Sequence, residues 1–399
     1  RKGLLPSSEG KQAEKCVILK LDKKTDDFCV SFDKHTFYLK PKENDLYVAE
    51  ALENIKYYMK HKEAVEEKNI ELYKSQQPVE STYRVLYNRI VIKEIRGRIR
   101  LYLQIVYEGK APARCKKDGS LRHTYGDGNV GIDVGTQSVA IVSKDKAVLK
   151  NLAERSKKIF NFERRIRLLN RAMDRSRRAN NPDFYNEDGT FKKGARKSSN
   201  VKWKNSKRYL KLIERHRELH RKASLSREYA INEDVNLVRS LGDRVIVEKM
   251  NIKALQKRAK ETTINEKTGK LNKKKRFGKS IGNRCPGGFI AQLERRFKCS
   301  HGEYKEVNTW TYKASQYDHM LDDCNKKQLS QRWHQFLNGI RVQRDLYSGM
   351  LLYCSDDTYS KPDNKKCKNF FNIFLKLHDD CIESIKARKY KVLNSGIKF

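Results

Sequence analysis

The chain has 399 residues, of which 88 are Lys or Arg and 49 are Asp or Glu, giving a formal net charge of +39 at pH 7. Such a large positive charge argues against an enzyme for small molecules. It indicates a polyanionic partner, because each phosphate that the protein neutralises releases counterions and so adds affinity. No run of about 18 apolar residues occurs, which predicts that no segment spans a membrane.

The first part of the chain predicts a β-rich domain that carries a helical insert. Residues 16–40 alternate between apolar and polar in the manner of strands. Residues 46–74 repeat apolar side chains near a 3.6-residue period, which predicts a helix. Strands return at 83–107, where an Arg-Gly pair supplies a hairpin turn, and a polar linker follows at 116–128.

The second part alternates strands and helices, which predicts a mixed α/β, multi-domain protein. Residues 253–280 hold eleven Lys or Arg and two acids, which indicates a mobile phosphate-binding loop. The other expected elements are an apolar hairpin (131–142), a basic helix (151–178), a polar loop (179–199), a helix to about 241, a strand (245–248), a helix (289–298), a strand (304–309), an irregular segment (311–340) and a helix (345–354).

Nine cysteines are spaced irregularly, and none forms a CxxC pair. This pattern argues against a disulfide framework and predicts free thiols in a reducing cytoplasm. Position 1 is Arg rather than Met, so the sequence leaves open whether N-terminal residues are missing. It also leaves the oligomeric state open.

Three carboxylates on apolar segments are the candidate catalytic residues: Asp133, Glu248 and Asp345. An Asp inside an apolar hairpin is costly unless a metal ion or hydrogen bonds satisfy it. Taken singly, Glu248 could be a surface acid after a strand, and Asp345 could simply compensate a helix N-terminus. Asp356 and Asp357 are weaker candidates for the third position, because they lie in a polar loop.

The order strand-Asp, strand-Glu, helix-Asp in a strongly basic chain resembles the TnpB/OrfB family of insertion sequences, from which compact type V CRISPR effectors appear to derive. The resemblance covers about residues 85–355. It is carried by GIDVGTQSVAIVS, MDRSRRANNPDFYNEDGTFKKG, SLGDRVIVEKMNIKAL, KKKRFGKSIGN, NTWTYKASQYDH, LSQRWH and VQRDLYSG.

The resemblance implies an RNA-guided DNA endonuclease whose catalytic acids are Asp133, Glu248 and Asp345. It implies an RNase H-like RuvC nuclease domain after a β-rich wedge domain. The implied parts are a wedge with an OB-like β-barrel (1–126) and a helical recognition segment (about 46–80), a RuvC domain (127–355) with a basic helical insert (151–241), a basic lid loop (253–284) and a degenerate zinc-knuckle-like module (310–340), and a C-terminal helical extension (356–399).

The implied cofactor is a pair of Mg²⁺ ions, which Mn²⁺ could replace, held by the three acids. The implied partners are a guide RNA, from a transposon end or a CRISPR array, and double-stranded DNA with a short flanking motif. The implied location is the bacterial cytoplasm, in association with the nucleoid. Expected nucleic-acid contacts are Arg175, Arg177, Arg178, Lys274, Lys275, Arg276, Gln316, Arg332 and Arg344.

One departure from the family concerns zinc. Family members usually place a knuckle of four cysteines between the second and third acids, beginning in TSQxCxxCG. Here Ser315 and Gln316 are followed by Tyr317, Asp318 and His319, and no tetrahedral set with CxxC spacing can be assembled. We therefore expect the module to pack without zinc, through aromatic side chains: Trp310, Tyr312, Tyr317 and Trp333.

Two other readings share these features. A guided DNA-binding repressor would bind without cutting, and the intact set of acids argues against it. A nuclease or transposase-associated DNA-binding protein that acts without a guide would have the same site, but it would not explain the wedge-like segment and the large excess charge.

Overall fold

The structure is a computed structural model with a mixed α/β fold. It describes residues 17–398 except for 33–34, 42–43, 78, 110, 117, 155–156, 191, 193–202, 267–268, 270, 273–277, 300–301 and 329. The chain divides into two compact units, Arg1–His123 and Thr124–Phe399. No helix in the described ranges is long and apolar enough to cross a membrane. All eight cysteines in those ranges are free thiols.

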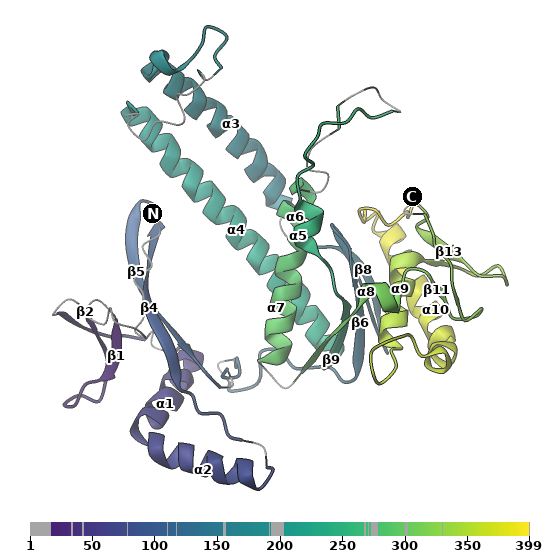
Figure 1. The fold of residues 1–399 in the computed structure, drawn as a ribbon, viewed down its shortest axis with the longest axis horizontal. Helices are drawn as coiled ribbons and strands as arrows, with labels where there is room; N and C mark the ends of the chain where they lie inside the picture. The colour runs from purple at the N-terminus through teal and green to yellow at the C-terminus, as the bar shows by residue number, and fades with distance from the viewer. Residues whose placement is uncertain are drawn as a thin grey trace. The chain divides into compact units, whose positions relative to one another are not determined.

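The first unit contains a three-stranded antiparallel sheet, two helices and a two-stranded ribbon (Figure 1). In chain order these are β1 (Ile18–Leu21), β2 (Phe28–Phe32), β3 (His35–Tyr38), α1 (Leu46–Lys60), α2 (Lys62–Lys74), β4 (Val85–Ile95) and β5 (Arg98–Tyr107).

One expectation for this unit is corrected. The single helix predicted over 46–74 is broken at His61, whose ψ of 32° is not helical and whose ring stacks on Tyr57. The described strands form two separate sheets, and the OB-like barrel stays a prediction. Leu19, Phe28 and Ile55 are buried where the two sheets and α1 meet.

The second unit is built on a five-stranded sheet with helices on both faces (Figure 1). Its elements are β6 (Asn129–Val134), β7 (Ser138–Ser143), β8 (Ala147–Asn151), α3 (Lys157–Asn180), η3 (Pro182–Phe184), α4 (Lys207–Leu241), β9 (Arg244–Glu248), α5 (Ile252–Gln256), α6 (Gly278–Arg284), α7 (Pro286–Lys298), β10 (Glu303–Val307), α8 (Thr309–Tyr312), β11 (Tyr317–Asp318), β12 (Asp323–Cys324), β13 (Trp333–Gln335), β14 (Arg341–Gln343), α9 (Arg344–Tyr353) and α10 (Asn364–Ala387).

The strand order of the large sheet is β10-β9-β6-β7-β8. Strands β6, β7 and β8 are antiparallel neighbours, whereas β9 runs parallel to β6, and β10 runs parallel to β9. Successive residues face opposite sides of a sheet. Val245 and Val247 accordingly pack with α4 and α7, whereas Ile246 between them packs with α9 and α10. The sheet is therefore the middle layer of three.

The sequence prediction missed β8, because residues 143–150 were assigned to no element and residue 151 was placed in the next helix. Ala147 and Leu149 turn into the core, and the basic helix begins later, at Lys157. Lys150 on β8 forms an ion pair with buried Asp234 of α4, which fixes that long helix to the sheet. Figure 1 shows α3 lying beside α4.

Candidate active site

Asp133 and Glu248 are placed side by side by two neighbouring parallel strands. Ile132 of β6 lies opposite Val247 of β9 in the strand register. The next residue on each strand is the acid, so the two carboxylates lie on neighbouring strands at the same edge of the sheet. Ile132 and Val247 pack with α4 and α7, so the alternation of side chains turns both acids toward the face that α9 covers.

Helix α9 brings Asp345 to the same edge because it runs antiparallel to β6. The amide of Asn129, at the start of β6, donates to the carbonyl of Tyr353, at the end of α9 (3.3 Å). From Tyr353 back to Asp345 the helix rises about 12 Å. From Asn129 to Asp133 the strand advances about 13 Å. The two lengths agree, so Asp345 lies level with Asp133.

A glycine allows this close packing of helix on strand. A Cβ atom added to Gly131 would lie 2.0 Å from the carbonyl oxygen of Gly349 and 2.3 Å from the backbone nitrogen of Tyr353. Gly349 itself faces Val142 of β7, where an added Cβ would lie 3.0 Å from the side chain. The backbones of β6 and α9 thus touch, and their spacing sets the distance between Asp133 and Asp345.

The electrostatics of the site show that the acids act on one another. Burial raises the pKa of Asp133 well above its ordinary value, and the charges of Asp345 and Glu248 raise it further. The guanidinium groups of Arg344 and Arg332 oppose these effects. Such a cluster of mutually repelling carboxylates is the environment in which a divalent cation is favourable.

Glu248 is also held away from bulk water. Burial raises its pKa, and a hydrogen bond from the backbone N–H of Ala314 acts in the opposite direction. No three His, Cys, Asp or Glu side chains in the described ranges lie close enough together to hold one ion jointly. The site fits Mg²⁺ nevertheless, because Mg²⁺ is commonly bound by one or two carboxylates together with water and substrate phosphates.

Gln343, which the sequence interpretation missed, orients Asp345. Its side-chain amide donates to Asp345 Oδ2 (3.2 Å) and to the carbonyl of Ser395 (3.3 Å). Its side-chain oxygen accepts from the N–H of Leu346 (2.8 Å), so the same residue caps α9. Gln is not among the preferred capping residues, so its position before Arg344 gave only a weak signal.

A buried histidine supports this cap from the C-terminal helix. The backbone N–H of Gln343 donates to His378 Nε2 (2.9 Å). Because Nε2 accepts, Nδ1 carries the proton and donates to Asp379 (2.8 Å). Burial lowers the pKa of His378, which keeps the ring neutral and able to accept. No spacing in the sequence connects His378 with Asp345, and only the tertiary fold reveals the link.

Of the two arginines near the acids, Arg332 lines a pocket and Arg344 is buried. The guanidinium of Arg344 donates to the carbonyls of Gln328 (3.4 Å) and Gln331 (3.0 Å) and lies 3.6 Å from Asp345. Arg344, expected to contact nucleic acid, thus holds a loop over the start of α9.

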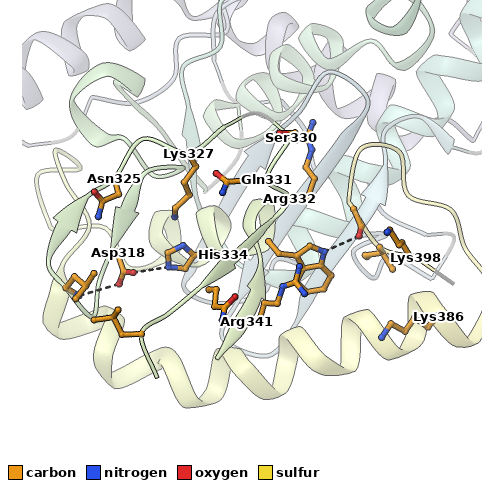
Figure 2. Close-up of a pocket in the computed structure, with 16 residues that line it drawn as sticks. Asp318, Asn325, Lys327, Ser330, Gln331, Arg332, His334, Arg341, Lys386 and Lys398 are labelled. Carbon is orange, nitrogen blue, oxygen red and sulfur yellow. Dashed lines mark hydrogen bonds and ion pairs between the residues drawn. The ribbon is translucent and has the colours of Figure 1, made fainter. Parts of the chain in front are cut away.

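The pocket that contains Arg332 has a volume of about 850 Å³ and is mainly cationic (Figure 2). The amine of Lys327 is buried and has no hydrogen-bond partner among the described residues. Burial lowers the pKa of Lys327 to about 8. A buried cation without a hydrogen-bond partner favours an anionic ligand, although the ring of Tyr347 lies 6.0 Å from this amine. The basic residues that line the pocket are Lys327, Arg332, Arg341, Lys386 and Lys398.

The module at 310–340 is held by a buried acid–histidine pair. Asp318 accepts from His334 Nε2 (3.0 Å; Figure 2). It also accepts from the backbone N–H of Met320 (2.9 Å). His334 stacks on Tyr347 of α9 with ring centroids 4.9 Å apart, and Phe336 packs edge-on against both rings.

Aromatic packing was expected in this module, and part of it occurs. Tyr312 and Tyr317 are buried, and Trp333 is partly buried, with its indole N–H donating to the carbonyl of Gly396 (3.1 Å). The expectation for Trp310 is wrong, because that residue is 86% exposed.

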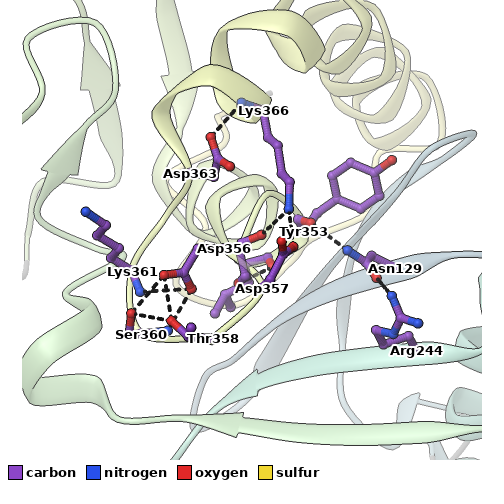
Figure 3. Close-up of polar contacts among 12 residues, drawn as sticks. Asn129, Arg244, Tyr353, Asp356, Asp357, Thr358, Ser360, Lys361, Asp363 and Lys366 are labelled. Carbon is purple, nitrogen blue, oxygen red and sulfur yellow. Dashed lines mark hydrogen bonds and ion pairs between the residues drawn. The ribbon is translucent and has the colours of Figure 1, made fainter.

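The weaker candidates for the third acid, Asp356 and Asp357, follow the end of α9 at Tyr353 (Figure 3), whereas Asp345 lies at its start. The carboxylate of Asp356 accepts from the backbone N–H of Ser360 (2.8 Å) and from its hydroxyl (2.8 Å), which closes a loop. Asp357 forms an ion pair with Lys366 (2.8 Å). Both acids are therefore remote from Asp133.

The nucleic-acid contacts predicted on α3 differ in how exposed their side chains are. Arg175 and Arg178 are exposed. Arg177 instead packs between helices, donating to the hydroxyl of Tyr209 (2.6 Å) and lying over the ring of Trp203 (4.8 Å).

Among the remaining predicted contacts, Gln316 is partly buried next to the 310–340 module's first turn. Lys274, Lys275 and Arg276 lie outside the described residues.

The comparisons with known proteins add nothing to this picture. No protein-family model matches the chain, and no curated protein is significantly similar to it. Function must therefore be inferred from the residues and their geometry.

Proposed function

We propose that the protein is an RNA-guided DNA endonuclease that hydrolyses phosphodiester bonds at a single site formed by Asp133, Glu248 and Asp345. The observation that carries the proposal is the convergence of these acids from β6, β9 and α9 at one edge of the sheet, where their charges interact. Clustered carboxylates in a chain of net charge +39 are suited to a polyanionic substrate.

The fold supports an RNase H-like nuclease domain. Three antiparallel strands are followed by two strands parallel to the first, with helices on both faces of the sheet. Ligands of such sheets bind beyond the carboxyl ends of the parallel strands. Asp133 and Glu248 are at those ends, as expected from the resemblance to the TnpB/OrfB family.

In the proposed mechanism the acids would hold two Mg²⁺ ions, which supply an activated water and stabilise the leaving oxygen. Asp133, Glu248 and Asp345 provide anionic oxygen atoms that are partly withdrawn from water. Gln343 keeps Asp345 in its orientation through the hydrogen bond to Oδ2. Arg332 contributes positive charge beside the acids, where the scissile phosphate would lie.

The surroundings of the acids suit a nucleic-acid strand. The cationic pocket around Arg332 and Lys327 would take phosphate groups of the strand near the site. Sequence specificity would come from pairing with a guide RNA, and the protein would read backbone shape and a short flanking duplex.

The experiment that tests the proposal has two parts. The protein is purified from cells that carry its native locus, and the bound RNA is sequenced. A discrete RNA with a variable segment supports guiding, whereas random cellular RNA would indicate an unguided nuclease. Cleavage of matched double-stranded DNA in Mg²⁺ is then measured for the wild type and Asp133→Ala. Binding without cleavage by the wild type would indicate a guided repressor, and cleavage by Asp133→Ala would refute the site.

A further inference from the structure

Trp310 combines exposure with a rigid setting. It lies on the single-turn helix α8 and is 86% exposed. One exposed apolar side chain is common on protein surfaces and needs no explanation by itself. The surroundings of this indole, however, differ from an ordinary surface position in three respects: anchoring, location and charge.

The turn that carries Trp310 is anchored from below. The side chain of Asn308 accepts from the backbone N–H of Trp310 (3.0 Å). Two residues after Trp310, Tyr312 is buried, and its hydroxyl donates to the carbonyl of Leu351 on α9 (2.7 Å). Tyr312 therefore fixes the turn to the core, and the indole of Trp310 extends into solvent.

The same turn is bonded to the end of β9, where the catalytic acid lies. The hydroxyl of Thr309 donates to the carbonyl of Lys249 (2.8 Å). After the turn, the N–H of Ala314 donates to the carboxylate of Glu248. Trp310 thus lies on a short segment whose two ends are hydrogen-bonded to Lys249 and Glu248.

Two exposed lysines accompany the turn. Lys313 follows Trp310 by three residues, and Lys249 is the residue whose carbonyl accepts from Thr309, whereas the nearest acids along this segment are Glu306 and Asp318. A purely apolar partner would gain nothing from these two cations. A stacked nucleobase flanked by phosphates would gain from both, because aromatic rings take the base and cations take the backbone.

We propose that Trp310 is a stacking platform for an unpaired nucleobase in the DNA strand that reaches the carboxylates. The proposal rests on the proposed function for the identity of that strand, although stacking itself can be measured without cleavage. Removing a base-stacking aromatic ring weakens single-strand binding by about tenfold or more.

The test uses full-length protein carrying Asp133→Ala, which binds DNA but does not cut it. The probe is a single-stranded DNA oligonucleotide that contains 2-aminopurine, whose fluorescence changes when the base stacks. We expect Trp310→Ala to weaken binding by about tenfold and to abolish the fluorescence change, and Trp310→Phe to retain most of both. The matched control is Ile373→Ala, because Ile373 is an exposed apolar side chain (50%) on α10 that does not line the pocket around Arg332.

The inference is overturned if Trp310→Ala binds the oligonucleotide as tightly as the parent protein does. It is also overturned if Ile373→Ala weakens binding to the same degree, or if Trp310→Phe behaves like Trp310→Ala. Failure of the proposed function looks different: protein with Asp133 intact would not cut DNA in Mg²⁺, while the dependence of oligonucleotide binding on the ring at position 310 would persist.

Discussion

At the scale of single residues, the buried charge of Asp133 lowers the stability of the fold, whereas the proposed chemistry needs that charge. Its carboxylate is buried beside Glu248 and Asp345, and burial is the largest cause of its raised pKa. A charged form that is disfavoured in the folded state lowers the free energy of unfolding increasingly as the pH rises from the ordinary pKa to the raised pKa, and by a constant amount above it. This loss of stability is offset only when a cation or a substrate binds to the charged carboxylate.

We therefore predict that Asp133→Asn abolishes Mg²⁺-dependent cleavage and stabilises the protein. The gain should be about 1 kcal/mol at pH 7.5 in EDTA, or roughly 2–4 °C in Tm. It should shrink as the pH falls below the raised pKa and vanish only below the ordinary value of 3.8, because Asp133 is then neutral in the unfolded chain as well. Thermal unfolding at pH 7.5 and pH 4 measures this, and an equal gain at both pH values would contradict the electrostatic explanation.

At the scale of elements, the site depends on how closely α9 packs on β6. Gly131→Ala would push the helix from the strand, because its added Cβ meets the backbone of α9. We expect a loss of about 3 kcal/mol in stability and about a hundredfold in cleavage, since Asp345 moves relative to Asp133.

The matched control for that substitution is Gly282→Ala. Gly282 lies in helix α6, and an added Cβ there has no neighbour within 4 Å. This variant should be as stable as the wild type or more stable by about 0.5–1 kcal/mol, and it should cut DNA normally. Chemical denaturation and cleavage rates distinguish the two glycines, and equal behaviour would refute the role of Gly131.

The cap of α9 has a second role that can be separated from stability. Gln343→Ala should cost about 1 kcal/mol through the lost cap and raise the Mg²⁺ concentration for half-maximal cleavage by about tenfold, because Asp345 loses a positioning partner. Asp363→Ala removes the cap of α10, remote from the acids. It should lose similar stability with an unchanged Mg²⁺ requirement. If the Mg²⁺ concentration for half-maximal cleavage rises equally in both variants, Gln343 has only a structural role.

At the scale of the whole molecule, the excess of 39 positive charges should dominate binding. We predict that affinity for double-stranded DNA, measured by fluorescence anisotropy, falls by about a thousandfold or more between 50 and 200 mM salt. Contacts with six or more phosphates produce a fall of this size. A fall of less than tenfold would mean that most of these cations do not touch the nucleic acid.

Local patterns in the sequence predict most of the second unit, because its strands are short apolar runs and its long helices are strongly periodic. Non-local packing decides what the sequence could not predict. His378 supports Gln343 across 35 residues of chain. Trp310 looks like a core residue by type, yet Tyr312 takes the buried position. The break in the helix at His61 likewise depends on tertiary contacts.

The supports of Asp345 come from late parts of the chain, since His378 and Ser395 both hold Gln343. A protein is synthesised from its N-terminus, and its parts fold as they emerge. Asp133 and Glu248 can therefore reach their strands well before Asp345 acquires its supports. The order of synthesis therefore separates the two strand acids from Asp345, whose supporting hydrogen bonds form only after residues 378 and 395 have emerged.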